Sequence, residues 1–310
     1  MKIQILMSTY NGEEYIRTQL DSIVNQTIEE KKLLIRDDGS IDNTVLIIQE
    51  YQKLYPWIEF YQGSNIGVQR SFFDLLEHSD SKADYIAFAD QDDKWLPEKL
   101  ECAVKKLKEL FQKTKQPLLY CGSQVMVDEQ LQPIDVTVTR IVKKAAFGNA
   151  LVQNICTGCT AVINQQLAEL IRNNIPKDID AVVMHDWWLY LVASCFGSVY
   201  YDNKSYILYR QHEKNTHGAI LRKRELIKYR IKQLTKPRGD VYRQVREFET
   251  VYIKILNSNN YEQKKKMINR LLLSEKKVTE RLLIAINNQY FRQKRGDNLV
   301  FKLIILIGKL

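Results

Sequence analysis

The sequence predicts an α/β protein whose mostly parallel sheet is flanked by helices and followed by a basic helical appendage. Short apolar runs rich in β-branched residues alternate with segments of helical periodicity through the first 111 residues, giving four strand–helix pairs in succession. Chains of this kind form parallel sheets with helices on both faces. The predicted strands are 2–7, 32–36, 57–61 and 85–89, and the predicted helices are 13–25, 44–54, 68–76 and 97–111.

Beyond residue 118 the alternation is less regular. From residue 221 onward the helical period returns with many Lys, Arg and Leu residues, and breaks at 236–239 and 257–260 divide this region into three predicted helices. We therefore expect a sheet domain at 1–220 and a helical region at 221–310. The remaining expected elements of the sheet domain are strands at 118–127 and 198–208, helices at 165–173 and 186–195, and an irregular excursion at 128–144.

Charge is distributed unevenly between these two parts. The whole chain of 310 residues carries a formal net charge of +9 and is 45% hydrophobic, which is typical of a globular protein rather than a disordered one. Residues 1–220 hold 23 basic and 29 acidic side chains, a net of −6, whereas residues 221–310 hold 23 and 8, a net of +15. A basic region of this strength indicates an anionic partner, such as nucleic acid or a lipid surface.

The five cysteines are an odd number, and no secretory leader is recognised, because Met1 leads directly into a predicted strand. We expect reduced thiols in the cytoplasm. No stretch approaches the roughly 20 apolar residues that span a bilayer. The run 299–307 is apolar but short, so it is expected to lie on a membrane surface rather than to cross the membrane.

Small and acidic residues follow each of the first four strands. In an open parallel sheet, ligands bind at the carboxyl ends of the strands, close to a reversal in strand order. Neighbouring carboxylates raise one another's pKa, so a rim that carries five aspartates requires a cation beside it. The segments concerned are 8–12, 37–40, 63–67 and 90–93.

Asp90 and Asp92 are the strongest candidates for a metal site. Their spacing after a buried strand lets both carboxylates point the same way, and hard oxygen ligands suit Mg²⁺ or Mn²⁺ bound to a diphosphate. A solvated turn with helix caps is the alternative for any Asp-rich loop, and Asp93 is interpreted as such a cap. The position at the end of a strand favours the metal site.

These four motifs, in this order and at this spacing, resemble the inverting family 2 of glycosyltransferases, which has the GT-A fold. Within that family the chain is most similar to bacterial rhamnosyltransferases of cell-wall and surface polysaccharide assembly. The resemblance extends through segments 185–188 and 209–212, which contain His-Asp-Trp-Trp and Tyr-Arg-Gln-His, and covers residues 1–217. The basic C-terminal region lies outside it.

The resemblance implies a role for each motif residue. A carboxylate accepts a hydrogen bond from the N3–H of a pyrimidine ring, and Asp38 is expected to provide it, with Asp37 supporting the loop. A divalent metal stabilises the charge that develops on the leaving diphosphate, and Asp92 is expected to bind that metal. The other donor-binding residues implied are Thr9 and Tyr10 at the base, Asn11, Asn65, Gly67 and Gln91 beside the nucleotide, and Asp90 at the ribose or sugar.

Asp186 is the candidate catalytic base. Transfer with inversion requires a carboxylate that removes a proton from the acceptor hydroxyl while its oxygen attacks the anomeric carbon. Asp186 precedes Trp187 and Trp188 at a predicted helix start, where an indole ring can stack on a sugar. The residues alone favour a helix cap and two core tryptophans, and the resemblance reverses that preference. His185 is given no catalytic role.

Arg210 and His212 follow the strand at 198–208. Arg210 offers planar donors for a diphosphate, with a surface salt bridge as the alternative, and His212 is a candidate metal ligand or phosphate contact. Cys156 and Cys159 have the spacing of a redox or zinc motif, but no second cysteine pair completes a tetrahedral site. They are interpreted as part of a loop of small residues, which the resemblance puts near the acceptor.

The basic segments 222–224, 264–266 and 276–277 recur among apolar residues of helical spacing. Association with anionic lipid is favoured over a solvated basic face on helices packed against the main domain or against a second subunit. Nucleic acid is not expected, because the region has no recognisable reading module. The protein is therefore expected on the cytoplasmic face of the membrane, where a lipid-linked acceptor is available.

The residues and the resemblance together predict an enzyme that moves L-rhamnose from dTDP-β-L-rhamnose to a lipid-linked saccharide through an α-1,3 linkage. The sugar and the linkage are implied by the resemblance alone. The alternatives are a transferase with a UDP-hexose donor and a non-catalytic protein that binds sugar nucleotides, although the set Asp38, Asp90, Asp92 and Asp186 argues against the latter. Dehydrogenases and nucleotidyl transferases are disfavoured, because their glycine-rich phosphate loops are missing after the first strand.

Overall fold

The computed structural model describes residues 1–134, 141, 143–213 and 239–310. The chain forms two compact units, each built from separate stretches of sequence. The predicted boundary after residue 220 lies outside the described residues, and the stretches 136–155 and 174–195 join the C-terminal helices rather than the sheet. The sheet unit comprises Met1–Asp135, Cys156–Asn173 and Phe196–Gly218, and the helical unit comprises Val136–Ile155, Asn174–Cys195 and Ala219–Leu310.

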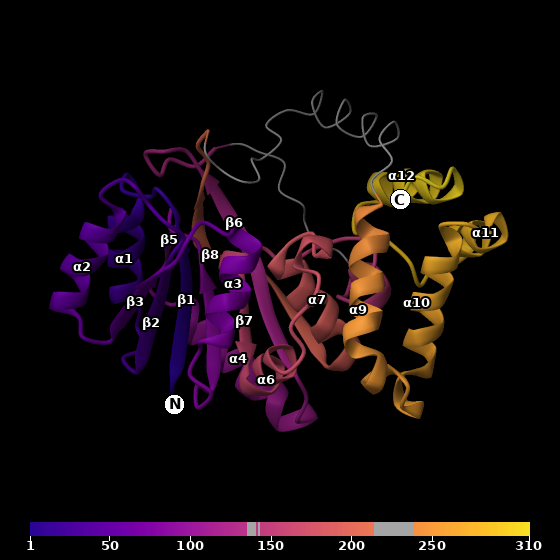
Figure 1. Ribbon diagram of the computed structural model, residues 1–310, viewed down its shortest axis with the longest axis horizontal. Helices are drawn as coiled ribbons and strands as arrows, with labels where there is room; N and C mark the ends of the chain where they lie inside the picture. The colour runs from indigo at the N-terminus through magenta and orange to yellow at the C-terminus, as the bar shows by residue number, and fades with distance from the viewer. Residues whose placement is uncertain (135–140, 142, 214–238) are drawn as a thin grey trace. The chain divides into compact units, whose positions relative to one another are not determined.

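Eight strands of the described chain form one mixed sheet in the order β3-β2-β1-β4-β7-β6-β8-β5 (Figure 1). β1 pairs in parallel with β2 and β4, β2 with β3, and β6 with β8. β7 is antiparallel to β4 and β6, and β5 is antiparallel to β8. The strands are β1 (Ile3–Thr9), β2 (Lys31–Asp37), β3 (Ile58–Gln62), β4 (Tyr85–Ala89), β5 (Lys94–Trp95), β6 (Leu118–Val127), β7 (Val162–Asn164) and β8 (Ser198–Arg210).

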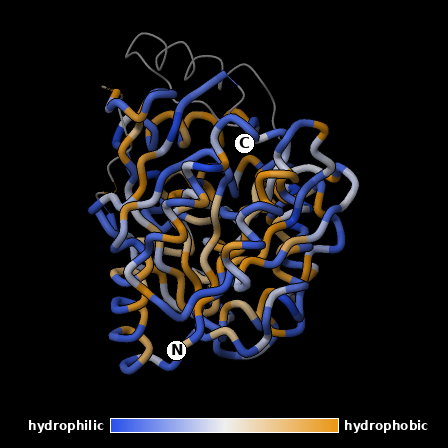
Figure 2. Tube along the Cα trace, turned by 90° about the vertical axis from the view of Figure 1, so that its left-hand side faces the viewer, coloured by the Kyte–Doolittle hydropathy of each residue, from blue (hydrophilic) through white to orange (hydrophobic). Residues whose placement is uncertain are grey.

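Helices cover both faces of the parallel part of the sheet, because successive side chains of a strand point to opposite faces. Ile3, Ile5 and Met7 of β1 belong to a core that also contains residues of α1, α2 and α4. Phe88 of β4 packs against Phe72 of α3 instead, with ring centroids 6.0 Å apart. Hydrophobic and hydrophilic residues alternate along the helices (Figure 2). These helices are α1 (Ile16–Val24), α2 (Thr44–Leu54), α3 (Val68–Glu77), α4 (Lys99–Thr114) and α6 (Gln165–Arg172).

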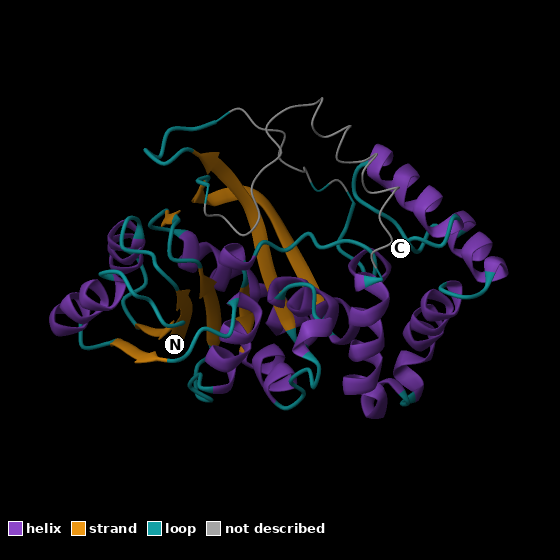
Figure 3. Cartoon of the chain, turned by 45° about the horizontal axis from the view of Figure 1, so that its top comes forward, coloured by secondary structure: helices purple, strands orange, loops and turns teal. Residues whose placement is uncertain are grey.

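The strands and helices predicted up to residue 127 are confirmed within a few residues at their ends, and α2, β4 and β6 have the predicted bounds. β6 and β8 are the long paired strands of the sheet (Figure 3). The short strands β5 and β7 were not predicted, because two or three residues carry no periodic signal of their own. Their pairing with strands far away in the sequence creates them.

The strand order reverses beside β1, since β2 and β3 extend the sheet on one side of it and β4 lies on the other. An α/β sheet binds its ligands in the crevice at the carboxyl ends of the strands at such a point. The loops that follow Thr9 and Ala89 therefore meet at the predicted ligand-binding edge.

The helical unit has its own core around Trp188. The Trp188 ring lies 5.7 Å from that of Phe248 and 6.2 Å from that of Tyr252, and all three side chains are fully buried. Its helices are α5 (Phe147–Ala150), α7 (His185–Phe196), α9 (Asp240–Leu256), α10 (Glu262–Ser274), α11 (Val278–Ile286) and α12 (Arg295–Leu306), the last four coloured orange to yellow in Figure 1.

The described part of the C-terminal region has four α-helices after residue 238, more than the three predicted for the whole region. The break at 257–260 is confirmed, but the chain also leaves the helical conformation at Lys277 and Asn287, which have extended backbones. Neither residue is a glycine or proline, so no residue type at these positions predicted the breaks. Among the described residues, no helix combines the length and apolar composition needed to cross a bilayer.

Candidate active site

Gln91 connects the loop after β4 to the loop after β1. Its side-chain amide accepts a hydrogen bond from the Tyr10 N–H and donates one to the Tyr10 carbonyl oxygen, both at 2.9 Å. A Cβ atom at Gly12 would lie 2.3 Å from the Gln91 Oε1, so glycine is needed there to make room for the amide. Gln91, which was predicted to bind the donor, thus holds two loops together through backbone contacts.

The Asp37 carboxylate organises the loop after β2. It is buried and accepts hydrogen bonds from the Thr9 hydroxyl at 3.0 Å and from the N–H and hydroxyl of Ser40 at 2.9 and 2.6 Å. The Ser40 hydroxyl also accepts from the Asn11 N–H, and the Asn11 side-chain oxygen accepts from the Ile41 N–H. Asp37 therefore supports the loop. Thr9, which was predicted to line the base pocket, is buried, and its hydroxyl is used by Asp37.

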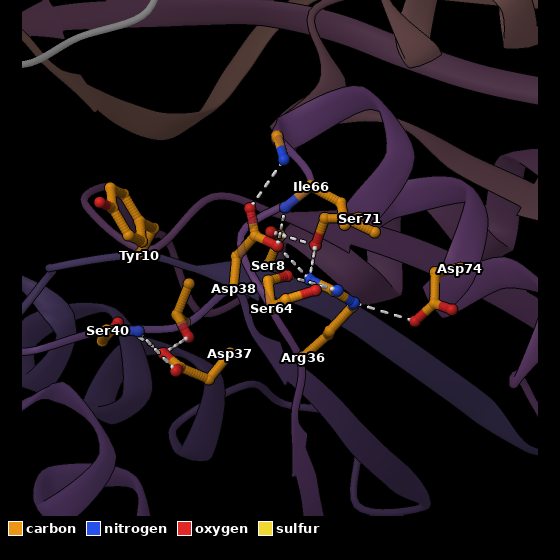
Figure 4. Close-up of polar contacts among 12 residues, drawn as sticks. Ser8, Tyr10, Arg36, Asp37, Asp38, Ser40, Ser64, Ile66, Ser71 and Asp74 are labelled. Carbon is orange, nitrogen blue, oxygen red and sulfur yellow. Dashed lines mark hydrogen bonds and ion pairs between the residues drawn. The ribbon is translucent and has the colours of Figure 1, made fainter. Parts of the chain in front are cut away.

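Asp38 lies at the centre of a second polar network (Figure 4). One carboxylate oxygen accepts from the Arg36 guanidinium and from the Ile66 N–H at 2.9 Å, and the other accepts from the Gly67 N–H at 2.9 Å. A carboxylate has about four acceptor positions, so the contacts among the described residues leave one position, on Oδ2. A hydrogen bond from a pyrimidine N3–H requires one such position.

Arg36 is a buried cation that links Asp38 to α3 and to the loop after β3. Its Nε donates to the Asp74 carboxylate at 3.0 Å, and a terminal nitrogen donates to the Ser64 carbonyl oxygen at 3.1 Å. The side chains of Arg36 and Asp38 are only 4% and 5% exposed, so their ion pair forms away from water. Arg36 was not among the predicted site residues, although a charged residue at the end of an apolar strand is itself the signal.

Three of the predicted donor-binding residues present open surface. Tyr10 is 46% exposed and Asn65 is also exposed. Nothing lies within 4 Å of the position that a Gly67 Cβ would take, and the Gly67 φ of +83° favours glycine. These residues, unlike Thr9, are accessible to a nucleotide.

Asp92 and His212, the two predicted metal ligands, are brought together from the loop after β4 and the end of β8. The His212 Nε2 lies 2.8 Å from the Asp92 Oδ2. The two atoms are hydrogen-bonded to each other. Two adjacent ligands of an octahedral cation, each at 2.0–2.2 Å from it, are at a similar separation of about 2.8–3.1 Å. Tyr15 stacks on the His212 ring, with centroids 4.7 Å apart, and fixes its orientation.

Arg210 belongs to the buried frame of this pair. Its N–H donates to the Asp93 carboxylate at 3.1 Å, its Nε donates to the Asp92 carbonyl oxygen at 2.8 Å, and a terminal nitrogen donates to the Glu129 carbonyl oxygen. The guanidinium lies over the Tyr15 ring, 4.7 Å from its centroid. Arg210 was predicted to bind the diphosphate, with a surface salt bridge as the alternative. The structure has the side chain buried, where it fixes the loop that carries Asp92.

Asp90, Asp93 and Cys159 form a second group whose ligand atoms lie within 4.8 Å of one another. Asp93 is fully buried, and burial, followed by repulsion from Asp92 and Asp90, raises its pKa well above the usual range. Burial also raises the pKa of the Cys159 thiol. The prediction that Asp93 caps a helix is wrong, since its carboxylate accepts from a backbone N–H of β8 and α4 begins only at Lys99.

Lys99 is a buried lysine near this group. Its Nζ lies 3.4 Å from the centroid of the Trp95 ring, and burial lowers its pKa to about 7, while Cys159 and Asp93 act in the opposite direction. Lys99 was not among the predicted site residues, although it shares a buried helical face with Ala103 at four-residue spacing, and a lysine on such a face was the available signal.

Asp186, the predicted base, lies in the first turn of α7, in the helical unit. The predicted donor-binding residues up to Gln91 belong to the sheet unit. Its carboxylate is mostly buried and accepts a hydrogen bond from the Asn154 side-chain amide at 2.9 Å. Burial lowers the pKa of the neighbouring His185 to about 3, so that ring is neutral at physiological pH. Asp186 therefore has a polar partner that orients it and a neighbour that brings no positive charge.

The two tryptophans after Asp186 differ in their surroundings. Trp187 is half-buried and donates from its indole nitrogen to the Ala150 carbonyl oxygen at 2.7 Å. Trp188 is a core residue of the helical unit, so the prediction that it stacks on a sugar is wrong. Only Trp187 remains as a candidate sugar platform.

The chain matches the family model described as glycosyl transferase family 2 over residues 4–164, more than half of its length. This chain belongs to glycosyl transferase family 2. It is 30% identical over 311 residues to the dTDP-rhamnosyl transferase RfbG of Shigella flexneri, and the alignment covers 97% of this chain and 99% of RfbG. The predicted enzyme class is confirmed.

Solved structures confirm the predicted α/β fold of the GT-A type. TarS 1–349 of S. aureus, in complex with UDP-GlcNAc, superposes with a TM-score of 0.61 at 17% identity, covering 94% of this glycosyltransferase and 78% of that chain. The mannosyltransferase PcManGT of Pyrobaculum calidifontis, in complex with GDP-Man and Mn²⁺, superposes with a TM-score of 0.51 at 14% identity, covering 99% and 85%.

Replacing Arg36 by Met should destabilise this glycosyltransferase by about 3–5 kcal/mol at neutral pH, because the Asp38 carboxylate would remain buried without its cation. Urea denaturation measures the free energy of unfolding. Arg17→Met is the matched control, because the Arg17 and Glu50 side chains of its ion pair are 52% and 55% exposed and the expected loss is below about 1 kcal/mol. Equal losses in the two variants would contradict the role assigned to Arg36.

Lys99 should make the stability of the enzyme depend on pH. Its pKa is about 7 in the folded state, against 10.5 for an exposed lysine, so between these values the unfolded chain binds more protons and stability rises with pH. Below pH 7 Lys99 is protonated in both the folded and the unfolded chain, so its buried charge lowers the stability of the folded state by the full amount. Lys99→Met should flatten the rise and add about 1–3 kcal/mol near pH 7, as measured by urea denaturation at several pH values. A variant that keeps the wild-type slope would disprove this assignment.

Proposed function

We propose that this family 2 glycosyltransferase transfers L-rhamnose, with inversion, from dTDP-β-L-rhamnose to a lipid-linked saccharide. The product linkage is α-1,3, and the pathway class is the synthesis of bacterial cell-wall or surface polysaccharide. The observation that carries the donor assignment is the 30% identity to a dTDP-rhamnosyl transferase over 97% of this chain. The linkage and the acceptor rest on the resemblance of the motifs to bacterial rhamnosyltransferases.

On the donor side, the remaining acceptor position on Asp38 Oδ2 receives the N3–H of the base. Tyr10 and Asn65 contact the nucleotide from the exposed rim, and Asp90 contacts the ribose or the sugar. Thymine and uracil share the N3–H, so Asp38 selects a pyrimidine without distinguishing the two. A UDP-hexose is therefore the alternative donor.

Asp92 and His212 are the residues that would hold Mg²⁺ or Mn²⁺, because their ligand atoms have the spacing of adjacent ligands of one cation. Cys159 is not assigned as a ligand, because a soft thiolate does not suit such a hard ion. When bound, the metal neutralises the diphosphate and stabilises it as a leaving group. Tyr15 and Arg210 hold the two ligands in place from the protein side.

On the acceptor side, Asp186 acts as the general base. Its carboxylate takes the proton of the acceptor hydroxyl as the hydroxyl oxygen bonds to the anomeric carbon and the bond to the diphosphate breaks. Asn154 orients the carboxylate, and the neighbouring His185 ring is neutral. Trp187 offers an aromatic surface next to the base.

We expect the enzyme to work in the cytoplasm, at the inner face of the membrane. Its proposed acceptor is anchored in lipid, and residues 221–310 carry 23 basic against 8 acidic side chains. Positive charge of this density is attracted to the anionic lipids of that face.

The donor assignment is tested with purified enzyme, a lipid-linked acceptor, Mg²⁺ or Mn²⁺, and a panel of dTDP- and UDP-sugars. Release of the nucleoside diphosphate should be at least about tenfold faster with dTDP-rhamnose than with any UDP-hexose. Chelation of the metal should abolish it. Turnover with a UDP-hexose and none with dTDP-rhamnose would replace the proposed donor by the alternative.

Replacing Asp186 by Asn should lower kcat by roughly 10²–10⁴-fold, because the amide cannot accept the proton. Donor affinity, measured by calorimetry, should not change, since the donor-binding residues belong to the other unit. Asp178→Asn is the matched control, an exposed carboxylate in the same unit, and should keep normal turnover. Near-normal turnover in the Asp186 variant would remove this residue from the mechanism.

A further inference from the structure

Two helices of the helical unit expose aliphatic side chains. Sixteen large hydrophobic residues of the described chain are exposed, and eight of them lie between Leu273 and Ile307. A concentration of this kind on a small part of the chain marks an interaction site. We define the α11–α12 face as the exposed aliphatic residues of these two helices and of the turn that ends α12: Val278, Leu282, Leu283, Ile286, Leu299, Leu303 and Ile307.

An ordinary surface helix turns its charged side to water. α11 does the opposite, because its charged side faces the protein and its aliphatic side faces water. Its two charged residues are half-buried: Glu280 pairs with Arg270 at 3.3 Å, and Arg281 donates to the carbonyl oxygens of Ser274 and Glu275 at 2.8 Å. The exposed positions carry no charge and are Val278, Thr279, Leu282, Leu283 and Ile286. The outward side of α11 is therefore suited to an apolar partner.

α12 also exposes aliphatic side chains on one side. Leu299, Leu303 and Ile307 are 61%, 46% and 51% exposed and follow one another at four-residue spacing, which puts them on one side of the helix. α11 and α12 contact each other, as Figure 1 shows. A Cβ atom at Gly308 would meet the Arg281 guanidinium of α11, so the end of α12 lies directly against its neighbour.

Basic residues lie near the exposed aliphatic residues of both helices in the sequence. Residues 276–310 contain eight Lys or Arg residues and two acidic ones, a net of +6. Lys276 and Lys277 are exposed just before α11, and Arg295 is exposed at the start of α12. One of the two acids, Glu280, is already paired with Arg270. The surroundings of the α11–α12 face are therefore strongly positive.

We propose that the α11–α12 face inserts its aliphatic side chains into the interface of a membrane that contains anionic lipid, while the nearby Lys and Arg residues bind the lipid head groups. Apolar rows beside basic residues are the combination that interfacial helices use. A second copy of the chain fits less well, because a dimer through this face would bring two regions of net +6 together. The proposal deepens the proposed function, from which it takes only the lipid-linked acceptor.

The experiment is flotation of the full-length enzyme with vesicles of phosphatidylcholine alone or of phosphatidylcholine mixed with phosphatidylglycerol. The wild type should bind the anionic vesicles at least about tenfold more strongly than the neutral ones, and high salt should weaken the binding. Equal binding to both kinds of vesicle, or binding to neither, would overturn the proposal.

Two double variants test the aliphatic rows, Leu282→Ser with Ile286→Ser and Leu299→Ser with Leu303→Ser. Each should lower binding to anionic vesicles about tenfold or more. The matched control, Leu46→Ser with Leu54→Ser, removes aliphatic residues of α2 that are 58% and 71% exposed and should bind as the wild type does. Lys276→Glu with Lys277→Glu should weaken binding and reduce its salt dependence. Unchanged binding in both aliphatic variants would refute the assignment.

Two further measurements distinguish this proposal from dimerisation through the same face and from the donor assignment. The molar mass in solution is measured for each variant, and a wild-type dimer that the aliphatic variants convert to monomers without loss of vesicle binding would assign the face to a second copy and overturn the proposal. Release of dTDP from dTDP-rhamnose is followed in the same preparations. The aliphatic variants should keep this activity, which also shows that they fold. If the wild type lacks the activity, the proposed donor is wrong, but the proposed membrane contact of the α11–α12 face is unaffected.

Discussion

The proposed donor side of this glycosyltransferase depends on the buried ion pair between Arg36 and Asp38. One carboxylate receives the guanidinium and the N–H groups of Ile66 and Gly67, so the end of β2 and the loop after β3 are held by the same two oxygens. Arg36 extends the connection to α3 through Asp74. Because a buried carboxylate without its cation is strongly unfavourable, the loops keep a single arrangement and leave one acceptor position for a base.

The metal side of the site is shaped by a different constraint, the crowding of three aspartates after β4. Burial and repulsion raise the pKa of Asp93, which favours its neutral form and leaves Asp92 as the carboxylate that faces His212. Arg210 contributes from β8 through backbone carbonyl oxygens, so its charge fixes the loop without approaching the substrate. The mixed sheet positions this group, because Arg210 at the end of β8 and His212 just after it contact the loop that follows β4.

Two roles are proposed for the helical unit, and its sequence composition suggests them only in outline. Its core around Trp188 supports α7, which carries the proposed base. Its outer helices instead expose aliphatic rows and bury part of their charge, as Glu280 and Arg281 show. A helix of this kind is stable in water only because its polar side finds partners inside the protein, and its apolar side remains available for lipid.

The sequence by itself determined the alternation of strands and helices and the convergence of the loops after the strands, because periodicity is local and parallel strand ends meet at one edge. Only the tertiary structure decided which of these side chains face a ligand. Thr9, Trp188 and Arg210 were expected at the substrate and are buried, while Lys99 was overlooked. Their environments are set by residues far away in the sequence, as for Arg210 and Asp92, which are 118 positions apart. Burial and partner choice are properties of the packed chain, and the same physical reason explains why the short strands β5 and β7 and the outward apolar side of α11 could not be read from the periodic pattern.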